Sequence, residues 1–151
     1  MGNTDYDDHK LIAFREAAME FDSVYARFAK NCGLSETEYW SLLLISEGIT
    51  TQSELSEKLS LSRQTLNSAF KQLIKKGLVR LETLENNQRV KKAILTAEGK
   101  CFVEKNIAKM HKLEENAWVS MTEEERCALT RLTRKYCRLV EQALINDKEE
   151  Y

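Results

Sequence analysis

Polar and basic side chains recur on one face of the helix that we predict over residues 62–76. At about 100° per residue, Gln64, Ser68 and Lys71 fall on the same side. Carboxamides can pair with adenine, hydroxyls can bond to several base edges, and lysines can bind phosphates. This face therefore has the chemistry to read a DNA major groove. The apolar side chains that we expect to be buried lie within one arc on the opposite side: Leu66, Phe70, Leu73 and Ile74.

The strongest candidates for DNA contact lie in the first turns of this helix and in the basic segment that follows it. Arg63 stands at the helix N-terminus, where it can reach a base or the backbone. Arg89 is predicted to project from a loop, and its guanidinium suits the negative potential of a minor groove. The full set of predicted contact residues is Ser62, Arg63, Gln64, Thr65, Asn67, Ser68, Lys71, Arg89 and Lys91.

The positive charge of the chain is concentrated in the same region. Residues 62–96 contain eight basic and two acidic residues, a balance of +6, whereas the whole chain of 151 residues has a net charge of −1. Everything outside this window therefore sums to −7. Because DNA phosphates attract clustered cations, this distribution favours a nucleic-acid partner more than the near-neutral total suggests.

Helix start signals define the elements that would position this face. Ser62 and Thr96 are suitable N-caps, and the absence of proline leaves long helices uninterrupted. Three pairs have the spacing of a capping box: Ser35 with Glu38, Thr51 with Glu54, and Thr122 with Glu125. We predict helices at 8–31, 35–46, 51–59, 62–76, 97–120 and 122–146, and strands at 79–83 and 91–95 joined by a loop at 84–90.

These elements predict a mainly α fold of the α+β type, a winged helix-turn-helix with a two-stranded β-wing. Residues 35–96 form the expected DNA-binding domain, flanked by long terminal helices in residues 1–34 and 97–151. The first helix repeats apolar residues at three- and four-residue spacing, and the last helix does the same. These faces can pack within one subunit. We favour dimerisation instead, because helix-turn-helix readers usually bind two half-sites one DNA turn apart.

The segments LSLSRQTLNSAFKQLIKKGLVRLET and NQRVKKAILTAEGK resemble the MarR family of bacterial transcription regulators. In that family the wing carries D-x-R, then five residues, then L-T; here Arg89 is followed by the same spacing to Leu95-Thr96. The resemblance implies a homodimer on pseudo-palindromic double-stranded DNA, usually a repressor released by a small ligand or an oxidant. Asn87 replaces the usual aspartate, so Arg89 lacks its orienting ion pair and is expected to be held less firmly.

Two kinds of switch are open to such a regulator. The resemblance implies a ligand between the dimer helices and the reading domain, although an aromatic cluster at a helix joint can equally be core. A redox sensor would instead need an exposed thiolate of low pKa. Cys32 near a helix end is the candidate, whereas Cys101, Cys127 and Cys137 are expected to be small buried residues. The predicted pocket residues are Tyr25, Phe28, Tyr39 and Trp40.

Other functional classes find little support in the sequence. No phosphate-binding glycine loop and no nucleophile or zinc-protease motif is present, so we predict neither an enzyme nor a cofactor. His9 and His111 are far apart and predict no metal site. No apolar run is long enough for a membrane helix, which favours a cytoplasmic protein. The remaining alternative is a winged-helix protein–protein interaction module, which would need apolar residues on the outer face of helix 62–76.

Overall fold

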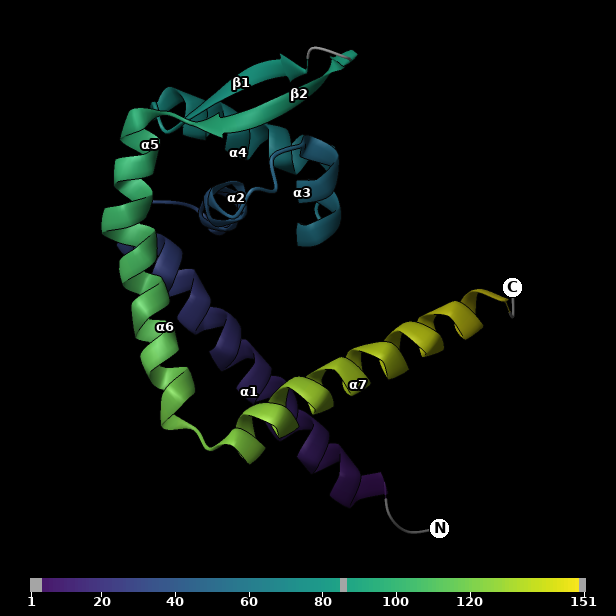
Figure 1. The fold of residues 1–151 in the computed structure, drawn as a ribbon. Coiled ribbons are helices and arrows are strands. Elements are labelled where there is room, and N and C mark those ends of the chain that lie inside the picture. The colour runs from purple at the N-terminus through teal and green to yellow at the C-terminus, as the bar shows by residue number, and fades with distance from the viewer. Residues whose placement is uncertain (1–3, 85–86, 150–151) are drawn as a thin grey trace. The chain divides into compact units, whose positions relative to one another are not determined.

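The structure is a computed structural model that describes residues 4–84 and 87–149, with side chains for residues 10–83 and 91–147. The chain divides into two compact units, Met1–Met110 and His111–Tyr151. The first unit contains the long helix α1, the helical module α2 to α4, the β-hairpin, and the helix that leaves it (Figure 1). The second contains the end of α6 and helix α7. The mainly helical winged-helix fold predicted from the sequence is confirmed.

The predicted helices are found with shifts of a few residues at their ends. Each predicted cap forms: Ser35 and Thr51 close capping boxes, Ser62 and Thr96 cap the following helices, and Thr122 and Glu125 exchange both capping bonds. Helix α1 begins four residues earlier than predicted. The elements of the first unit are α1 (Thr4–Asn31), α2 (Glu36–Ser46), α3 (Gln52–Leu59), α4 (Arg63–Lys75), β1 (Val79–Leu84), β2 (Asn87–Leu95) and α5 (Ala97–Phe102).

The helix predicted at 97–120 is interrupted. A π-helical turn, η1 (Val103–Ile107), separates α5 from α6 (Ala108–Ser120). A π-turn inserts one extra residue in the hydrogen-bond ladder and rotates the residues that follow. In this segment Ile107 and Met110 are buried, although no proline or glycine marks the break. The periodicity of the sequence could not reveal it, because a single-residue offset leaves both flanking helical patterns intact.

The hairpin is longer than predicted. Strands β1 and β2 pair antiparallel from Val79 opposite Leu95 to Thr83 opposite Lys91, and pairing resumes at Leu84 opposite Asn87 after an irregularity. The prediction that Arg89 leaves a loop was therefore wrong, since its backbone belongs to β2. Extended pairing satisfies backbone groups that a seven-residue loop would leave to water. The side chain of Arg89 lies outside the described residues.

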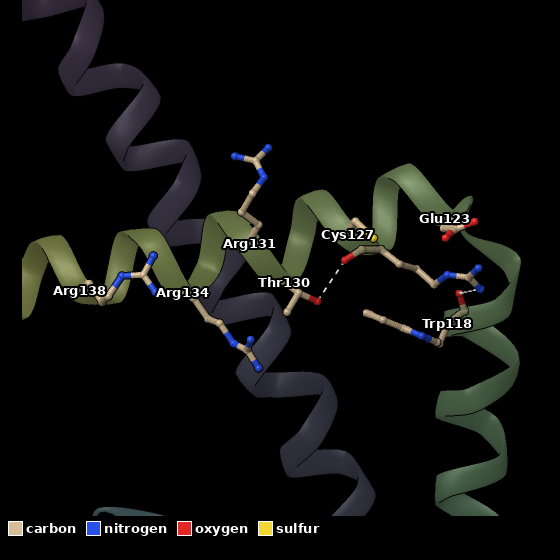
Figure 2. Close-up of a pocket in the computed structure, with 8 residues that line it drawn as sticks. Trp118, Glu123, Cys127, Thr130, Arg131, Arg134 and Arg138 are labelled. Carbon is tan, nitrogen blue, oxygen red and sulfur yellow. Dashed lines mark hydrogen bonds between the residues drawn. The ribbon is translucent and has the colours of Figure 1, made fainter.

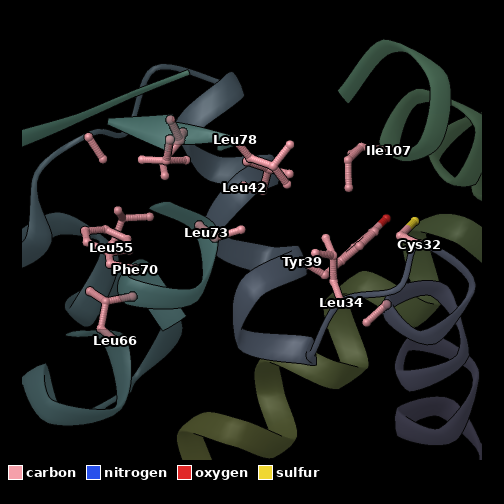
Figure 3. Close-up of a cluster of buried hydrophobic side chains, with 14 of the residues drawn as sticks. Cys32, Leu34, Tyr39, Leu42, Leu55, Leu66, Phe70, Leu73, Leu78 and Ile107 are labelled. Carbon is pink, nitrogen blue, oxygen red and sulfur yellow. The ribbon is translucent and has the colours of Figure 1, made fainter. Parts of the chain in front are cut away.

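One apolar core holds the first unit together. In Figure 3, Leu55, Leu66 and Phe70 gather on one side and Leu34 and Tyr39 on the other. Of the four α4 residues predicted to be buried, three are confirmed, but Ile74 is 42% exposed and Ala69 is buried instead. Ile74 lies at the margin of the apolar arc, about 90° from its centre, so the core ends before reaching it.

Helix α7 (Glu123–Glu149) carries an exposed apolar face. Leu132 is 51% exposed and Leu139 is 54% exposed. None of the helices within residues 4–84 and 87–149 is long and apolar enough to cross a bilayer. The exposed apolar side chains that follow one face of α7 are Leu129, Leu132, Tyr136, Leu139, Val140 and Leu144.

Candidate nucleic-acid interface

The N-terminus of α4 has features that favour binding of an anion. Ser62 has an extended backbone conformation, and its Oγ accepts a hydrogen bond from the backbone N–H of Thr65 at 3.1 Å. The first turn of α4 contains no acidic residue, in contrast with α2, α3 and α7. Because the positive end of the helix dipole is not neutralised by a carboxylate, it adds to the charge of Arg63.

The outer face of α4 is presented to solvent. The predicted contact residues of this helix are all exposed, and its opposite side contributes Leu66 and Leu73 to the core with no exposed surface. Two hydroxyls on this face are already engaged: Ser68 donates to the carbonyl of Gln64, and Thr65 bonds to Ser62. Among the described residues, the side chains of Arg63, Gln64 and Lys71 form no hydrogen bond or ion pair. The exposed contact candidates of α4 and its cap are Ser62, Arg63, Gln64, Thr65, Asn67, Ser68 and Lys71.

The C-terminal end of α4 is anchored to α2 by a buried carboxylate. Glu38 is only 4% exposed, and its Oε2 accepts from Lys76 Nζ at 2.8 Å and from the backbone N–H of Ser35 at 2.8 Å. Lys76 also donates to the carbonyl of Gly33 at 3.3 Å. The sequence predicted the capping box but not this ion pair, because the partners lie 38 positions apart. Lys76 is therefore a structural cation rather than a free phosphate contact.

The wing is fastened to the start of α3. Thr51 and Lys92 form an antiparallel β-bridge, and the backbone N–H of Ala93 donates to the carbonyl of Thr50 at 2.8 Å. Glu54 has a lowered pKa because it accepts hydrogen bonds from the side chain and backbone of Thr51, with a smaller contribution from the charge of Lys92. Lys91 is exposed next to this junction. The described part of the wing therefore carries two exposed cations, Lys91 and Arg80, and Arg80 is paired with Glu82.

Two hydrogen bonds from Thr96 hold the base of the wing together. Thr96 Oγ1 donates to the carbonyl of Gly77 at 2.5 Å, and its backbone N–H donates to the carbonyl of Leu78 at 3.1 Å. A Cβ on Gly99 would lie 1.9 Å from the Leu78 carbonyl oxygen. Only glycine fits there, which explains why a glycine stands in the first turn of α5. Sequence reasoning did not detect this close approach between two residues distant in sequence.

The aromatic residues predicted to form a ligand pocket do gather at the joint of α1 and α2. The ring centroid of Tyr25 lies 5.3 Å from that of Phe28 and 5.4 Å from that of Trp40, and Tyr39 lies 5.2 Å from Trp40. Tyr39 is buried in the core, so it supports the cluster rather than lining a cavity. An open hollow of about 300 Å³ lies beside the cluster, and its walls are Phe21, Asp22, Tyr25, Glu36 and Trp40.

The burial of the four cysteines is the reverse of what the sequence predicted. Cys32 is buried, and desolvation raises the pKa of its thiol, which argues against it as a redox sensor. Cys101, Cys127 and Cys137 were predicted to be buried and are exposed. The prediction was wrong because a helical pattern places these cysteines on a helix face but does not specify that the face is buried. Among the described residues no three His, Cys, Asp or Glu side chains cluster as metal ligands.

The second unit contains a basic hollow that the sequence did not single out. It has a volume of about 670 Å³ and includes Trp118 and Cys127 in its wall. Figure 2 shows the guanidinium groups of Arg131 and Arg134 pointing away from each other. These cations therefore do not converge on one anion. The arginines along the hollow are Arg126, Arg131, Arg134 and Arg138.

The capped pair α3 and α4, followed by a β-hairpin that is bonded to the start of α3 and at its own base, defines the class of winged helix-turn-helix proteins, in which one helix is presented to a DNA groove. Residues 33–89 match the sequence model of the MarR family. This segment of the chain is therefore similar in sequence to the MarR family. No curated protein sequence matches the chain.

Solved structures share the fold over nearly the whole chain. A MarR family regulator from Neisseria meningitidis superposes with a TM-score of 0.78 at 17% identity, covering 91% of this chain and 98% of that one. A MarR family transcriptional regulator from Streptomyces coelicolor, solved in complex with DNA, has a TM-score of 0.75 at 23% identity, with 91% and 89% covered. The M. tuberculosis transcriptional regulator MOSR, also in complex with DNA, has a TM-score of 0.62 at 25% identity, with 89% and 96% covered.

Proposed function

We propose that this chain is a sequence-specific transcriptional regulator that binds double-stranded DNA as a homodimer. The observation that carries the proposal is the outer face of α4, where exposed carboxamides and cations lie opposite the side that buries Leu66 and Leu73. The acid-free N-terminus of the same helix supports an anionic partner. Two of the similar structures were solved with DNA, which is consistent with this use of the fold.

A mobility-shift titration across salt concentrations tests the DNA partner. We expect the logarithm of the affinity to fall linearly with the logarithm of salt, by about 0.9 for each phosphate neutralised. A selected operator fragment should bind more tightly than a shuffled duplex of the same composition. An affinity that does not change with salt concentration, together with equal affinity for both duplexes, would contradict the proposal. That result would favour a protein partner for the winged helix.

We place the dimer contact on the apolar face of α7. Six apolar side chains on one face are solvent-exposed in the single chain, a stripe of the kind that marks a subunit interface. Replacing Leu132 and Leu139 together by aspartate should convert the dimer to monomer in sedimentation at micromolar concentration. Replacing Arg131 and Arg138 by aspartate is the matched control on the opposite face. A wild-type chain that sediments as a monomer at every concentration contradicts this assignment.

We propose that a small ligand binds in the hollow at the joint of α1 and α2. If the protein is a repressor, binding of this ligand should release it from DNA. The aromatic walls together with the carboxylates of Asp22 and Glu36 suit a small aromatic cation. Benzyltrimethylammonium is a direct probe. It should quench Trp40 fluorescence and weaken operator binding. Quenching should persist in Trp118→Phe and disappear in Trp40→Phe; the reverse pattern would place the ligand elsewhere.

A further inference from the structure

The carboxamide of Asn67 is held by a neighbouring helix. Gln52, the first residue of α3, donates from Nε2 to Oδ1 of Asn67. Ser62, Thr65 and Ser68 bond only within α4 and its cap. Among the described residues on the outer face of α4, Asn67 alone has a side-chain hydrogen bond to another element. The orientation of this one candidate base reader is therefore set by tertiary structure.

The bond distinguishes the two ends of the Asn67 carboxamide. Its oxygen has two acceptor sites and its nitrogen has two donor hydrogens. A free asparagine can rotate to present either end, but Oδ1 here is directed toward Gln52. Because oxygen and nitrogen diverge from the same carbon, Nδ2 is directed away from Gln52. Among the described residues Nδ2 forms no hydrogen bond, so it is the donor that remains available to a partner on the face of α4.

We propose that Gln52 is a positioning residue for base recognition, because it holds Oδ1 of Asn67 and so presents Nδ2–H to the major groove. The preferred base edge then carries an acceptor at that point, O6 of guanine or O4 of thymine, rather than the N6 donor of adenine. Cytosine presents its N4 donor there and is disfavoured. This inference rests on the proposed function, since it requires α4 to lie in a major groove.

Gln52→Glu gives the sharpest test because it inverts the bond. A carboxylate cannot donate, so Glu at this position would accept from Nδ2 of Asn67 and turn Oδ1 outward. The preferred base edge should then carry a donor, N4 of cytosine or N6 of adenine. Ser53→Glu is the matched control. It adds the same charge in the same turn of α3 at an exposed site, and Ser53 has no side-chain hydrogen bond within the described part of the chain.

The experiment is selection from a randomised duplex library by the full chain and its variants, with sequencing of the bound DNA. Asn67→Ala should lose base preference at one position of each half-site. Gln52→Ala should weaken that preference on the order of five- to tenfold, the size of one base-edge contact, while binding to unrelated DNA is unchanged. Gln52→Glu should move the preference to cytosine or adenine. Ser53→Glu should weaken binding to all sequences and keep the wild-type preference.

Three results would overturn the inference. Wild-type preference in both Gln52 variants would show that the bond does not orient Asn67, and the proposed function would stand. A change of preference in Ser53→Glu equal to that in Gln52→Glu would assign the effect to charge. A wild-type chain that selects no sequence at all would overturn the proposed function together with this inference. Thermal unfolding of each variant verifies that the surface changes leave the fold intact.

Discussion

Helices α4 and α7 have similar sequences in one respect and opposite surroundings. Residues 62–81 contain five cations and no acid, and residues 126–140 also contain five cations and no acid. The apolar side of α4 is buried, with Leu66 and Leu73 fully enclosed. The apolar side of α7 is open, with Leu132 51% exposed. Local charge and periodicity therefore do not distinguish a helix whose apolar side is buried from one whose apolar side is exposed.

The helix ends and the supports make the difference. The first turn of α4 has no acid, whereas that of α7 has Glu123, Glu124 and Glu125. The positive end of the α7 dipole is thus neutralised, and its cations point in different directions (Figure 2). Helix α4 is also anchored at its C-terminal end by the Glu38–Lys76 pair. Helix α4 is thus the nucleic-acid candidate of the two for two reasons. Its apolar face is buried, and its first turn contains no carboxylate.

Truncating one leucine on each helix should give the largest contrast. Leu66→Ala removes a fully buried side chain and should lower the free energy of unfolding by about 2–5 kcal/mol. Leu132→Ala removes a half-exposed side chain and should leave the fold of the monomer nearly unchanged. Urea denaturation measures both. If the dimer forms through α7, the Leu132 variant should also lose the dependence of stability on protein concentration; equal losses in the two variants would refute the contrast.

The wing tests whether reading extends beyond α4. Arg89→Ala should weaken operator binding by more than about tenfold, because a guanidinium in a minor groove is lost. Fluorescence anisotropy with a labelled operator measures the change. Arg80→Ala is a control on the other strand of the hairpin, since Arg80 already pairs with Glu82. Unchanged affinity of the Arg89 variant would show that Arg89 makes no contact with operator DNA.

Single cations on the two helices should differ in their effect on DNA. Lys71→Ala on α4 should weaken binding to every sequence by about threefold to tenfold and reduce the salt slope by roughly one phosphate. Arg134→Ala on α7 should change neither quantity. Titrations at several salt concentrations provide both numbers. An equal loss for the α7 variant would mean that charge alone, rather than presentation, drives DNA binding.

The smallest effect concerns pH and the support of the wing. The pKa of Glu54 lies below its ordinary value of 4.5, so the ionised form stabilises the fold. This contribution is complete above the unfolded-state pKa and is lost as pH falls through the lower folded-state pKa. Glu54→Gln should therefore lower the Tm slightly at pH 7, with the difference from wild type vanishing in strong acid. Glu57→Gln removes the same charge from the same helix and is the control; its Tm at pH 7 should stay close to that of wild type.

The sequence by itself determined where the helices begin and most of the candidate face, but not the break at η1 or the full length of the hairpin. Caps such as Ser35, Thr51 and Ser62 act within three residues, so local spacing is enough to place them. The buried arc of α4 followed from periodicity, and only its margin at Ile74 was wrong. The chemistry of the outer face was likewise readable, because side-chain type does not depend on the fold.

Tertiary structure alone decided which of these features are connected. The Glu38–Lys76 pair, the Gln52–Asn67 bond and the approach of Gly99 to Leu78 each join residues distant in sequence. The burial of Cys32 and the exposure of Cys127 were also decided there, since a helical pattern specifies a face but not what covers it. Local signals encode backbone conformation; contacts between elements depend on packing that no single segment contains.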